Sequence, residues 1–427
     1  MTAPDDVKQP ERPKLRDIMG PGLITGASDD DPSGIATYSQ VGAQFGFGLG
    51  WTLIVTFPLM AAIQEIAARI GRVTGVGIAG NLRKYYPTWL LQVIIALLVL
   101  ANVINIGADL GAMGAALKLL IGGPSFLYVI GFAAISILLE VFVRYSRYVS
   151  VLKYLTLSLL AYVATVFVVG TPWLTVLHDV VLPPLSLSKD YVLAITAVLG
   201  TTISPYLFFW QAQEEVEDEQ EKPQKQPLID APGQAPGEMF RIRIDTVIGM
   251  ALSNIVALFI IITTAATLHA HGVTDIETSS QAAEALRPIA GPFAFVLFAA
   301  GIIGTGLLAL PVLAGSAAYA LGEAMGWQVG LAKKATRAPA FYGAIAAAGI
   351  VGAVMNFSPI DPIKALFWSA VINGIVAVPV MAIMMLMTHR RDIMGQFVLS
   401  WPLRTLGWLA TAAMAATAIA LGVTSFF

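Results

Sequence analysis

Cysteine is absent from this chain of 427 residues, and only 12% of its residues are charged. The absence of cysteine excludes disulfides, thiolate nucleophiles and thiolate metal ligands. The charged fraction is about half of that in an average soluble domain, which argues against a soluble protein of this length. With a formal net charge of −2, the chain also lacks the basic excess that nucleic-acid binding requires.

Catalytic motifs are missing as well. The four histidines lie outside the long apolar runs, and we interpret them as surface or interfacial residues: His178, His269, His271 and His389. The chain contains no His-Glu-x-x-His or Gly-x-Ser-x-Gly motif and no Cys/His cluster. We therefore expect neither an enzyme nor a protein with a bound cofactor.

Apolar sequence is abundant, since hydrophobic residues make up 57% of the chain. Windows of about twenty residues indicate about eleven membrane-spanning helices. Their expected ranges are 18–44 (interrupted), 47–70, 89–117, 125–143, 149–170, 190–211 (interrupted), 243–267, 290–321, 340–356, 362–388 and 403–425. If the N-terminus is cytoplasmic, only Lys118, Lys189, Arg287 and Lys364 among the basic residues lie outside, so every loop obeys the positive-inside rule.

The spans divide into two groups of five and one extra helix. We expect a cytoplasmic tail over 1–17, five-span units over 18–170 and 190–388, and an eleventh span over 403–425. The tail lacks the apolar core of a signal peptide. Residues 212–240 are acidic and then rich in Pro, Gln and Gly, which predicts a flexible cytoplasmic loop. The sequence thus predicts an all-α multi-pass protein of the cell (inner) membrane.

One of these spans contains three consecutive carboxylates, Asp29, Asp30 and Asp31, followed by Pro32. Ionisable groups at membrane depth are rare and mark ion or substrate pathways. A helix that breaks there is tolerated where it lines a cavity or is packed in protein. The simpler alternative is an ordinary helix start, with Asp31 as N-cap and Pro32 in the first helical position.

A second break is predicted in the segment from Gly200 to Tyr206, which contains Pro205. It falls in the first span of the second unit, as the aspartate run falls in the first span of the first unit. Because each unit has an odd number of spans, the two units insert with opposite orientations. This is the design of an inverted-repeat transporter, whose paired discontinuous helices form the substrate site. Free carbonyls beside a carboxylate make an oxygen-rich pocket that suits a metal cation.

The two breaks also resemble a known family. Gly20-Pro21-Gly22 followed by Asp31-Pro32-Ser33-Gly34 resembles the first helix of the Nramp family of divalent-metal transporters, with its Gly-Pro-Gly and Asp-Pro-Gly-Asn motifs. The segment from Thr201 to Tyr206 is similar to the family's sixth helix, Ala-x-x-Met-Pro-His, in register with Pro205. Residues 106–110 in span three match as well. The resemblance implies a LeuT-type fold of 5+5 inverted repeats with discontinuous helices 1 and 6, and no cofactor besides the transported cation.

The same resemblance implies a metal site with an altered ligand set. Asp31 corresponds to the metal-binding aspartate, Gly34 replaces the asparagine ligand, Thr201 stands where a backbone carbonyl binds, and Ser204 replaces the methionine. Thioether sulfur favours transition metals, whereas oxygen ligands suit Mg²⁺, Ca²⁺ and Mn²⁺. Fewer protein ligands and more space would also fit Mg²⁺, which keeps several waters. The pattern is similar to the Nramp-related magnesium transporters, a divergent branch that carries Mg²⁺ and Mn²⁺.

Proton coupling is expected to be absent. Proton-coupled Nramps have a glutamate three residues after an aspartate in span three, and a histidine after the proline in span six. Here Asp109 is kept, but Ala112 and Tyr206 occupy the other two positions. Alanine cannot relay a proton, and tyrosine, with an ordinary pKa near 10, is a poor carrier at pH 7. We therefore expect a uniporter that moves Mg²⁺, and also Mn²⁺, into the cytoplasm by alternating access.

Other functions stay open at this point. A proton-coupled Mn²⁺ importer would need a substitute proton path through Asp29, Asp30 or Asp109. An organic-solute symporter of the same architecture would bind a substrate carboxylate at its half-helix N-termini, which the three aspartates oppose. A membrane scaffold or receptor would not need buried carboxylates. The expected partners are the divalent ion and the lipid bilayer but no nucleic acid, and we expect a monomer.

Charged residues near the inner ends of the spans have a simpler interpretation. We expect Glu65, Glu140 and Asp245 to form interfacial ion pairs, and the expected partners are Arg69, Arg144 and Arg241 respectively. The acidic run over 214–221 is expected to be a solvated helix end, with a cation-attracting vestibule as the alternative.

Overall fold

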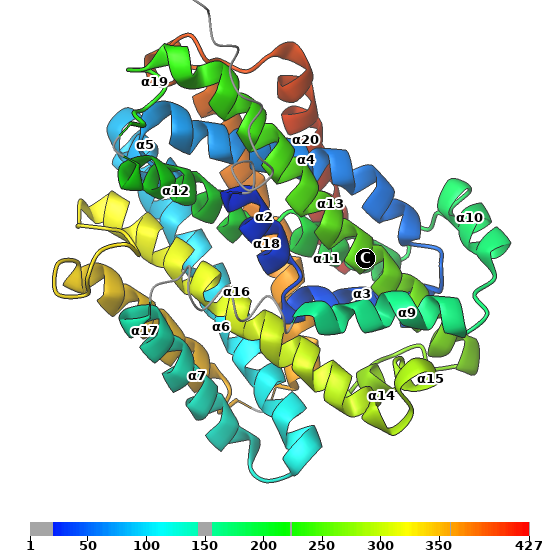
Figure 1. Cartoon of the computed structure of the whole chain (residues 1–427). Coiled ribbons are helices and arrows are strands. Elements are labelled where there is room, and N and C mark those ends of the chain that lie inside the picture. The colour runs from blue at the N-terminus through cyan, green and yellow to red at the C-terminus, as the bar shows by residue number, and fades with distance from the viewer. Residues whose placement is uncertain (1–19, 144–155, 223, 359, 427) are drawn as a thin grey trace, which may run out of the picture.

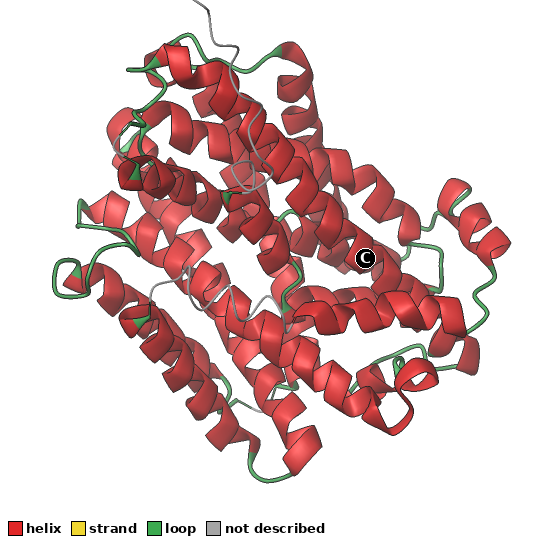
Figure 2. Ribbon diagram, in the orientation of Figure 1, coloured by secondary structure: helices red, strands yellow, loops and turns green. Residues whose placement is uncertain are grey.

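The computed structural model of the protein describes residues 20–143, 156–222, 224–358 and 360–426. Within these ranges the secondary structure is helical throughout, and the helices form one bundle (Figures 1 and 2). Eight helical segments are long and apolar enough to cross a membrane, or nine if the bent pair Leu157–Val168 and Trp173–Val181 counts as one span. The predicted all-α membrane architecture is confirmed.

Each predicted span has a helical counterpart in the described ranges, although the start of the fifth, 149–155, lies outside them. The counterparts are α2 (Pro21–Asp29) with α3 (Pro32–Phe45), α4 (Gly50–Thr74), α6 (Thr88–Ile121), α7 (Ser125–Phe142), α9 (Leu160–Val168), α11 (Lys189–Thr202) with α12 (Pro205–Glu221), α13 (Ala235–Thr267), α16 (Ala294–Met325), α17 (Pro339–Met355), α18 (Pro362–His389) and α20 (Trp401–Phe426). The first span is split into two short helices, and α17 has 17 residues, so neither counts among the eight.

Short helices in the connections were not predicted. They are α5 (Ile78–Tyr85), α10 (Trp173–Val181), α14 (Ser279–Glu284), α15 (Arg287–Ala290), α19 (Arg391–Met394) and the 3₁₀ turns η1 (Thr156–Leu159), η2 (Pro232–Gln234), η3 (His269–His271) and η4 (Gly291–Phe293). The clearest example is α10, which turns by 110° from α9 and lies at the edge of the bundle (Figure 1). Gly170, with a positive φ, and Pro172 lie between the two helices and are typical turn residues.

The bounds of the predicted loop over 212–240 are wrong, because helices occupy both of its ends. Helix α12 continues to Glu221, and α13 begins at Ala235. The connection between them packs against α4, because Leu228 is fully buried and its amide donates to the carbonyl of Arg72. The Arg72 guanidinium in turn donates to the carbonyl of Gln226 at 2.6 Å. A Pro- and Gln-rich composition does not reveal such an anchor.

Two glycine contacts fix the half-helices that precede the breaks. A Cβ at Gly26 of α2 would lie 2.3 Å from the carbonyl of Gly249 in α13. A Cβ at Gly200 of α11 would lie 1.9 Å from the carbonyl oxygen of Ala370 in α18. Only glycine allows backbones to approach this closely, as in other tightly packed membrane helices. Both half-helices are therefore held against a long helix of the second repeat, and the two breaks meet inside the bundle.

Candidate metal centre

The first break is organised by Asp31, the N-cap of α3. Its Oδ1 accepts a hydrogen bond from the amide of Gly34 at 2.7 Å, and Pro32 occupies the first helical turn. This arrangement satisfies one of the free amides that every helix start exposes. The capping role considered as the simple alternative is therefore real, and it holds a carboxylate in the interior, where Asp31 is 2% exposed.

A side-chain hydrogen bond joins the two breaks. The hydroxyl of Tyr206, in the first turn of α12, donates to Oδ2 of Asp31 at 3.0 Å. On the facing side, a Cβ at Gly34 would lie 3.3 Å from Oγ1 of Thr201, at the end of α11. The structure thus brings Asp31, Gly34, Thr201 and Tyr206 together from both repeats.

Ser204 lies in the gap between α11 and α12. Its hydroxyl donates to the carbonyls of Gly200 at 2.9 Å and of Thr201 at 3.0 Å. A hydroxyl that donates in this way keeps its own lone pairs, and each carbonyl keeps a second one. The second break therefore offers neutral oxygen atoms, from Ser204 and from the carbonyls at the end of α11.

The side chains of Asp29 and Asp30 share a hydrogen-bond partner in α13. The hydroxyl of Ser253, in α13, donates to Oδ2 of Asp29 at 2.6 Å and contacts Oδ1 of Asp30 at 3.1 Å. Both carboxylates thus lie against α13, whereas Asp31 belongs to α3. Three consecutive residues at a helix break point in different directions, and their sequence alone did not reveal which one would face the second break.

Asp109 occupies the middle of α6 and is fully buried. It lies close enough to Asp31 for the two carboxylates to interact electrostatically. Neither of its carboxylate oxygens has a hydrogen-bond partner within the described ranges. A role of Asp109 in an ion or proton pathway stays a prediction.

Two neighbours of the site were missed. The ring of Tyr38 lies 3.3 Å from the position of a Cβ at Gly34, so Tyr38 and Thr201 fill the space that the glycine was expected to open. The sulfur of Met113 and the ring of Pro32 both lie against Gly306 of α16. Met113 follows Asp109 by one helical turn, and that spacing is the signal that could have found it.

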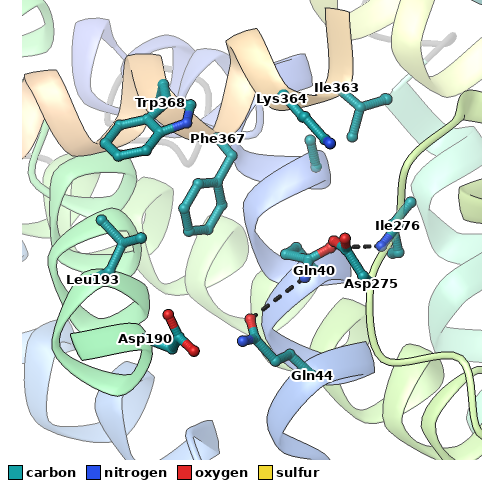
Figure 3. Close-up of a pocket in the computed structure, with 11 residues that line it drawn as sticks. Gln40, Gln44, Asp190, Leu193, Asp275, Ile276, Ile363, Lys364, Phe367 and Trp368 are labelled. Atoms are coloured by element: carbon teal, nitrogen blue, oxygen red, sulfur yellow. Dashed lines mark hydrogen bonds between the residues drawn. The ribbon is translucent and has the colours of Figure 1, made fainter. Parts of the chain in front are cut away.

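A cavity of about 180 Å³ lies beside the C-terminal part of α3 (Figure 3). Ala36, Gln40 and Gln44 line it at one-turn intervals, opposite side chains of α11, α18 and the segment before α14. Gln40 is held in place by the amide of Ile276, which donates to its side-chain oxygen at 2.8 Å. The cavity begins one turn beyond the start of α3, and Asp31 does not line it. Within the described ranges, no three His, Asp or Glu side chains lie close enough to hold a metal on their own.

Ion pairs link α4, α12 and α13 at the other end of the bundle. Arg72 is fully buried and contacts Glu219 at 3.0 Å and Glu238 at 3.4 Å. Arg241 pairs with Glu215 and Glu238. The acidic run was expected to be solvated, but Glu215 is fully buried and Glu219 is 7% exposed. The arginines come from α4 and α13, distant in sequence, so the run gave no hint of its partners.

The three expected interfacial ion pairs have different outcomes. Glu65 pairs with Arg69 at 2.5 Å, as predicted. Asp245 accepts from the amides of Gly20, Gly22 and Leu23, and so caps the start of α2. The expected bond from Arg241 to Asp245 is therefore wrong, because free amides at a helix start compete for the carboxylate.

The third pair involved Glu140, whose Oε1 accepts from Ser136 at 2.9 Å. Its expected partner, Arg144, lies outside the described residues.

Comparison with known proteins supports the architecture over nearly the whole chain. The model of the family described as natural resistance-associated macrophage protein-like (Nramp) matches residues 22–424. A "Divalent metal cation transporter MntH" of Deinococcus radiodurans is 24% identical over 93% of this chain and 87% of its own. The protein of the same name from Pectobacterium carotovorum is 26% identical, over 89% and 88% of the two chains.

Solved structures show the same fold. A mutant of the Eremococcus coleocola manganese transporter superposes with a TM-score of 0.75 at 16% identity, covering 96% of this chain and 88% of that one. MhsT, solved with L-phenylalanine, gives a TM-score of 0.59 at 12% identity over 95% and 97% of the two chains. The LeuT-type fold is thus confirmed. In this family a transported metal is a substrate and no cofactor is implied. The match across residues 22–424 shows that the chain belongs to the Nramp family and is a membrane transporter, not an enzyme.

Proposed function

We propose that the chain carries divalent cations into the cytoplasm across the inner membrane by alternating access. The relatives named above are a divalent metal cation transporter and a manganese transporter. The observation that carries the proposal is the convergence of one carboxylate, Asp31, with neutral oxygens at the ends of two discontinuous helices. Hard cations prefer this type of oxygen environment.

The proposed first coordination shell consists of Asp31, Ser204, the carbonyl of Thr201 and water. Tyr206 donates to Asp31, and a bound cation would compete with the phenol for the same carboxylate oxygen. Gly34 contributes no side-chain ligand, and Tyr38 and Thr201 flank it closely. Waters would complete the shell, and Mg²⁺ is the divalent ion that keeps its waters most firmly. We therefore propose Mg²⁺ as the preferred substrate and Mn²⁺ as a second one.

The proposed mode is uniport driven by the membrane potential. Ala112 is buried in α6 and has no group that could exchange a proton. Tyr206 is engaged as a hydrogen-bond donor to Asp31. An inside-negative potential contributes about 2.3 kcal/mol per charge per 100 mV, hence about 4.6 kcal/mol for a divalent cation. This is enough to concentrate the ion without a proton gradient.

Uptake into proteoliposomes with internal metal and pH reporters tests the proposal. An imposed inside-negative potential should drive Mg²⁺ and Mn²⁺ influx without internal acidification, and a pH gradient at zero potential should not. Protein-free liposomes under the same potential give the background. Equal uptake with and without protein would remove the transport proposal.

A second candidate is a proton-coupled Mn²⁺ importer, favoured by one observation. Asp109 is a buried carboxylate near Asp31, and its oxygens lack partners among the described residues. Intramembrane carboxylates of this kind form proton relays in transporters. Metal-dependent acidification of the liposome interior that is lost in Asp109→Asn would establish this candidate in place of uniport.

A further inference from the structure

A second cavity, of about 340 Å³, lies between α4, α13 and α20, away from the metal centre. Its walls include Phe57, Pro58, Val247, Leu403 and Leu406. Its polar lining consists of Glu65, Arg69, Arg243 and Ser400. Helices α13 and α20 both pack against α4, so α4 forms the floor of a groove. None of these residues takes part in the proposed transport site.

The polar and apolar residues of this groove are separated along its length. In α4 the apolar pair Phe57 and Pro58 precedes Arg69 by about three turns, or roughly 16 Å. In α13 the order is reversed, because Arg243 comes first and Val247 one turn later. In α20 Ser400 immediately precedes the helix, and Leu403 and Leu406 follow. All three helices thus place their polar residues at the basic end of the bundle.

The groove lies on the surface that would face lipid. Beyond Val247, Ile248 and Leu252 of α13 are 47% and 54% exposed, and Leu409 of α20 is 53% exposed. Trp401 is 70% exposed and follows Ser400 at the polar end of the groove, which we call its mouth. Tryptophan is enriched where a membrane protein crosses the level of the lipid headgroups. A ligand of this groove would therefore have its polar part at headgroup level and its apolar part along the acyl chains.

The charges at the mouth leave one positive charge uncompensated. Arg69 pairs with Glu65 at 2.5 Å. Arg243 is exposed and has no ion-pair partner within the described ranges. The Nε of Arg69 is buried and has no acceptor among the described residues. The Arg243 guanidinium and the Arg69 side chain, which is 19% exposed, line the open cavity, and a phosphate group accepts hydrogen bonds from arginine particularly well.

From these observations we propose that the groove between α4, α13 and α20 binds one monoanionic phospholipid, with its phosphate at Arg243 and Arg69. The acyl chain lies along Val247, Leu403 and Leu406. Basic pockets between membrane helices on the inner side recognise anionic headgroups in this way. The single net positive charge fits a lipid such as phosphatidylglycerol, whereas a zwitterionic lipid leaves Arg243 unbalanced.

Lipid retention in the full-length protein tests this proposal. The protein is purified in neutral detergent and supplied with phosphatidylglycerol or phosphatidylcholine, and bound lipid is counted by native mass spectrometry. We expect one phosphatidylglycerol per chain and at least about tenfold weaker retention of phosphatidylcholine. The melting temperature should rise by several degrees with phosphatidylglycerol at about a hundredfold excess over Kd.

Variants separate a groove from general surface charge. Arg243→Gln, and the double change Glu65→Gln with Arg69→Gln, should each lose phosphatidylglycerol retention. Arg404→Gln is the matched control, because Arg404 is exposed at the same end of α20 but does not line the groove. Leu406→Trp should fill the apolar part and exclude lipid while both arginines stay. Loss in Arg404→Gln equal to that in Arg243→Gln, or full retention in Leu406→Trp, would overturn the proposal.

Glycerol 3-phosphate distinguishes the lipid from its headgroup. It should neither shift the melting temperature nor compete with phosphatidylglycerol at the concentration at which the lipid saturates the protein. Equal binding of glycerol 3-phosphate, or equal retention of the two phospholipids, would show that the groove is not a site for an anionic lipid. Mass spectrometry reads bound lipid directly, so a variant with lower thermal stability still gives an answer.

Discussion

The two helix breaks face each other but differ in chemistry. The break between α2 and α3 contains three carboxylates, and Asp31 caps the helix that follows it. The break between α11 and α12 contains no charged residue, and Ser204 donates back to the carbonyls of the helix that precedes it. One repeat supplies the charge, and the other supplies dipoles. A site assembled this way pays the desolvation cost of only one ionised ligand at its centre.

The largest expected effect comes from removing that charge. Asp31→Ala should reduce divalent uptake into proteoliposomes to the level of protein-free vesicles, because Asp31 both caps α3 and accepts the hydrogen bond from Tyr206 in the second break. Asp392→Asn, at an exposed ion pair with Arg390, serves as the matched control and should transport normally. Undiminished uptake by a folded Asp31→Ala protein would remove the site assignment.

The second-largest effect is expected from a change of ligand type in the break between α11 and α12. Ser204→Met places a thioether where the hydroxyl now lies, and soft sulfur favours Cd²⁺ and Mn²⁺ over Mg²⁺. We expect the ratio of Cd²⁺ to Mg²⁺ affinity to rise by about tenfold, or about 1.4 kcal/mol. Met113→Leu, which removes a thioether near Pro32, should leave this ratio unchanged. If Met113→Leu lowers it instead, the selectivity lies in α6.

The contact that joins the breaks gives a mixed effect. Tyr206→Phe leaves Oδ2 of Asp31 without its donor, and the loss of a hydrogen bond to a charged group costs about 1.5–3 kcal/mol. The ion-free protein should therefore melt at a lower temperature. Mg²⁺ binding, measured by calorimetry, should become several-fold tighter because the phenol no longer competes. Weaker binding would place the Tyr206 hydroxyl in the coordination shell.

A smaller effect is expected where the two breaks touch. Gly34→Asn restores a side-chain ligand and should shift the preference in the same direction as Ser204→Met, but by only a few-fold. The new Cβ would lie 3.3 Å from Thr201 and from Tyr38, so both neighbours must move. Gly34→Ala, which adds the Cβ without the amide, separates crowding from ligation. The same shift of preference in both variants would attribute the effect to crowding alone.

The smallest effect should come from the other two carboxylates of the first break. Ser253→Ala removes the hydroxyl that Asp29 and Asp30 share. Uptake of Mg²⁺ should stay within about threefold of the unmodified protein, with a stability loss of about 1–3 kcal/mol for the unsatisfied group. Loss of transport in this variant would place Asp29 or Asp30 on the ion pathway.

Sequence patterns located both breaks because proline and carboxylates are unusual at membrane depth. Asp31, Gly34, Thr201 and Ser204 were named from the resemblance to the Nramp family, and the structure brings Asp31, Gly34 and Thr201 close together. The direction of Asp29 and Asp30 was not predictable, since it depends on Ser253 in a distant helix. The ion pairs of Arg72 and Arg241 were not predicted for the same reason, because their partners in the acidic run are far away in the sequence. Composition describes a segment by itself, whereas burial depends on what packs against it.

The glycine contact between α2 and α13 has a mechanical consequence. The backbones of α2 and α13 touch at Gly26 and Gly249, with no side chain between them that could repack if the helices moved relative to each other. Asp245 of α13 also accepts hydrogen bonds from the amides at the start of α2. Helices α2 and α13 should therefore move as one rigid body, and the angle between α2 and α3 should change during the movement. Spin labels on α2 and α13 should keep their separation through the transport cycle, while labels on α2 and α3 should not.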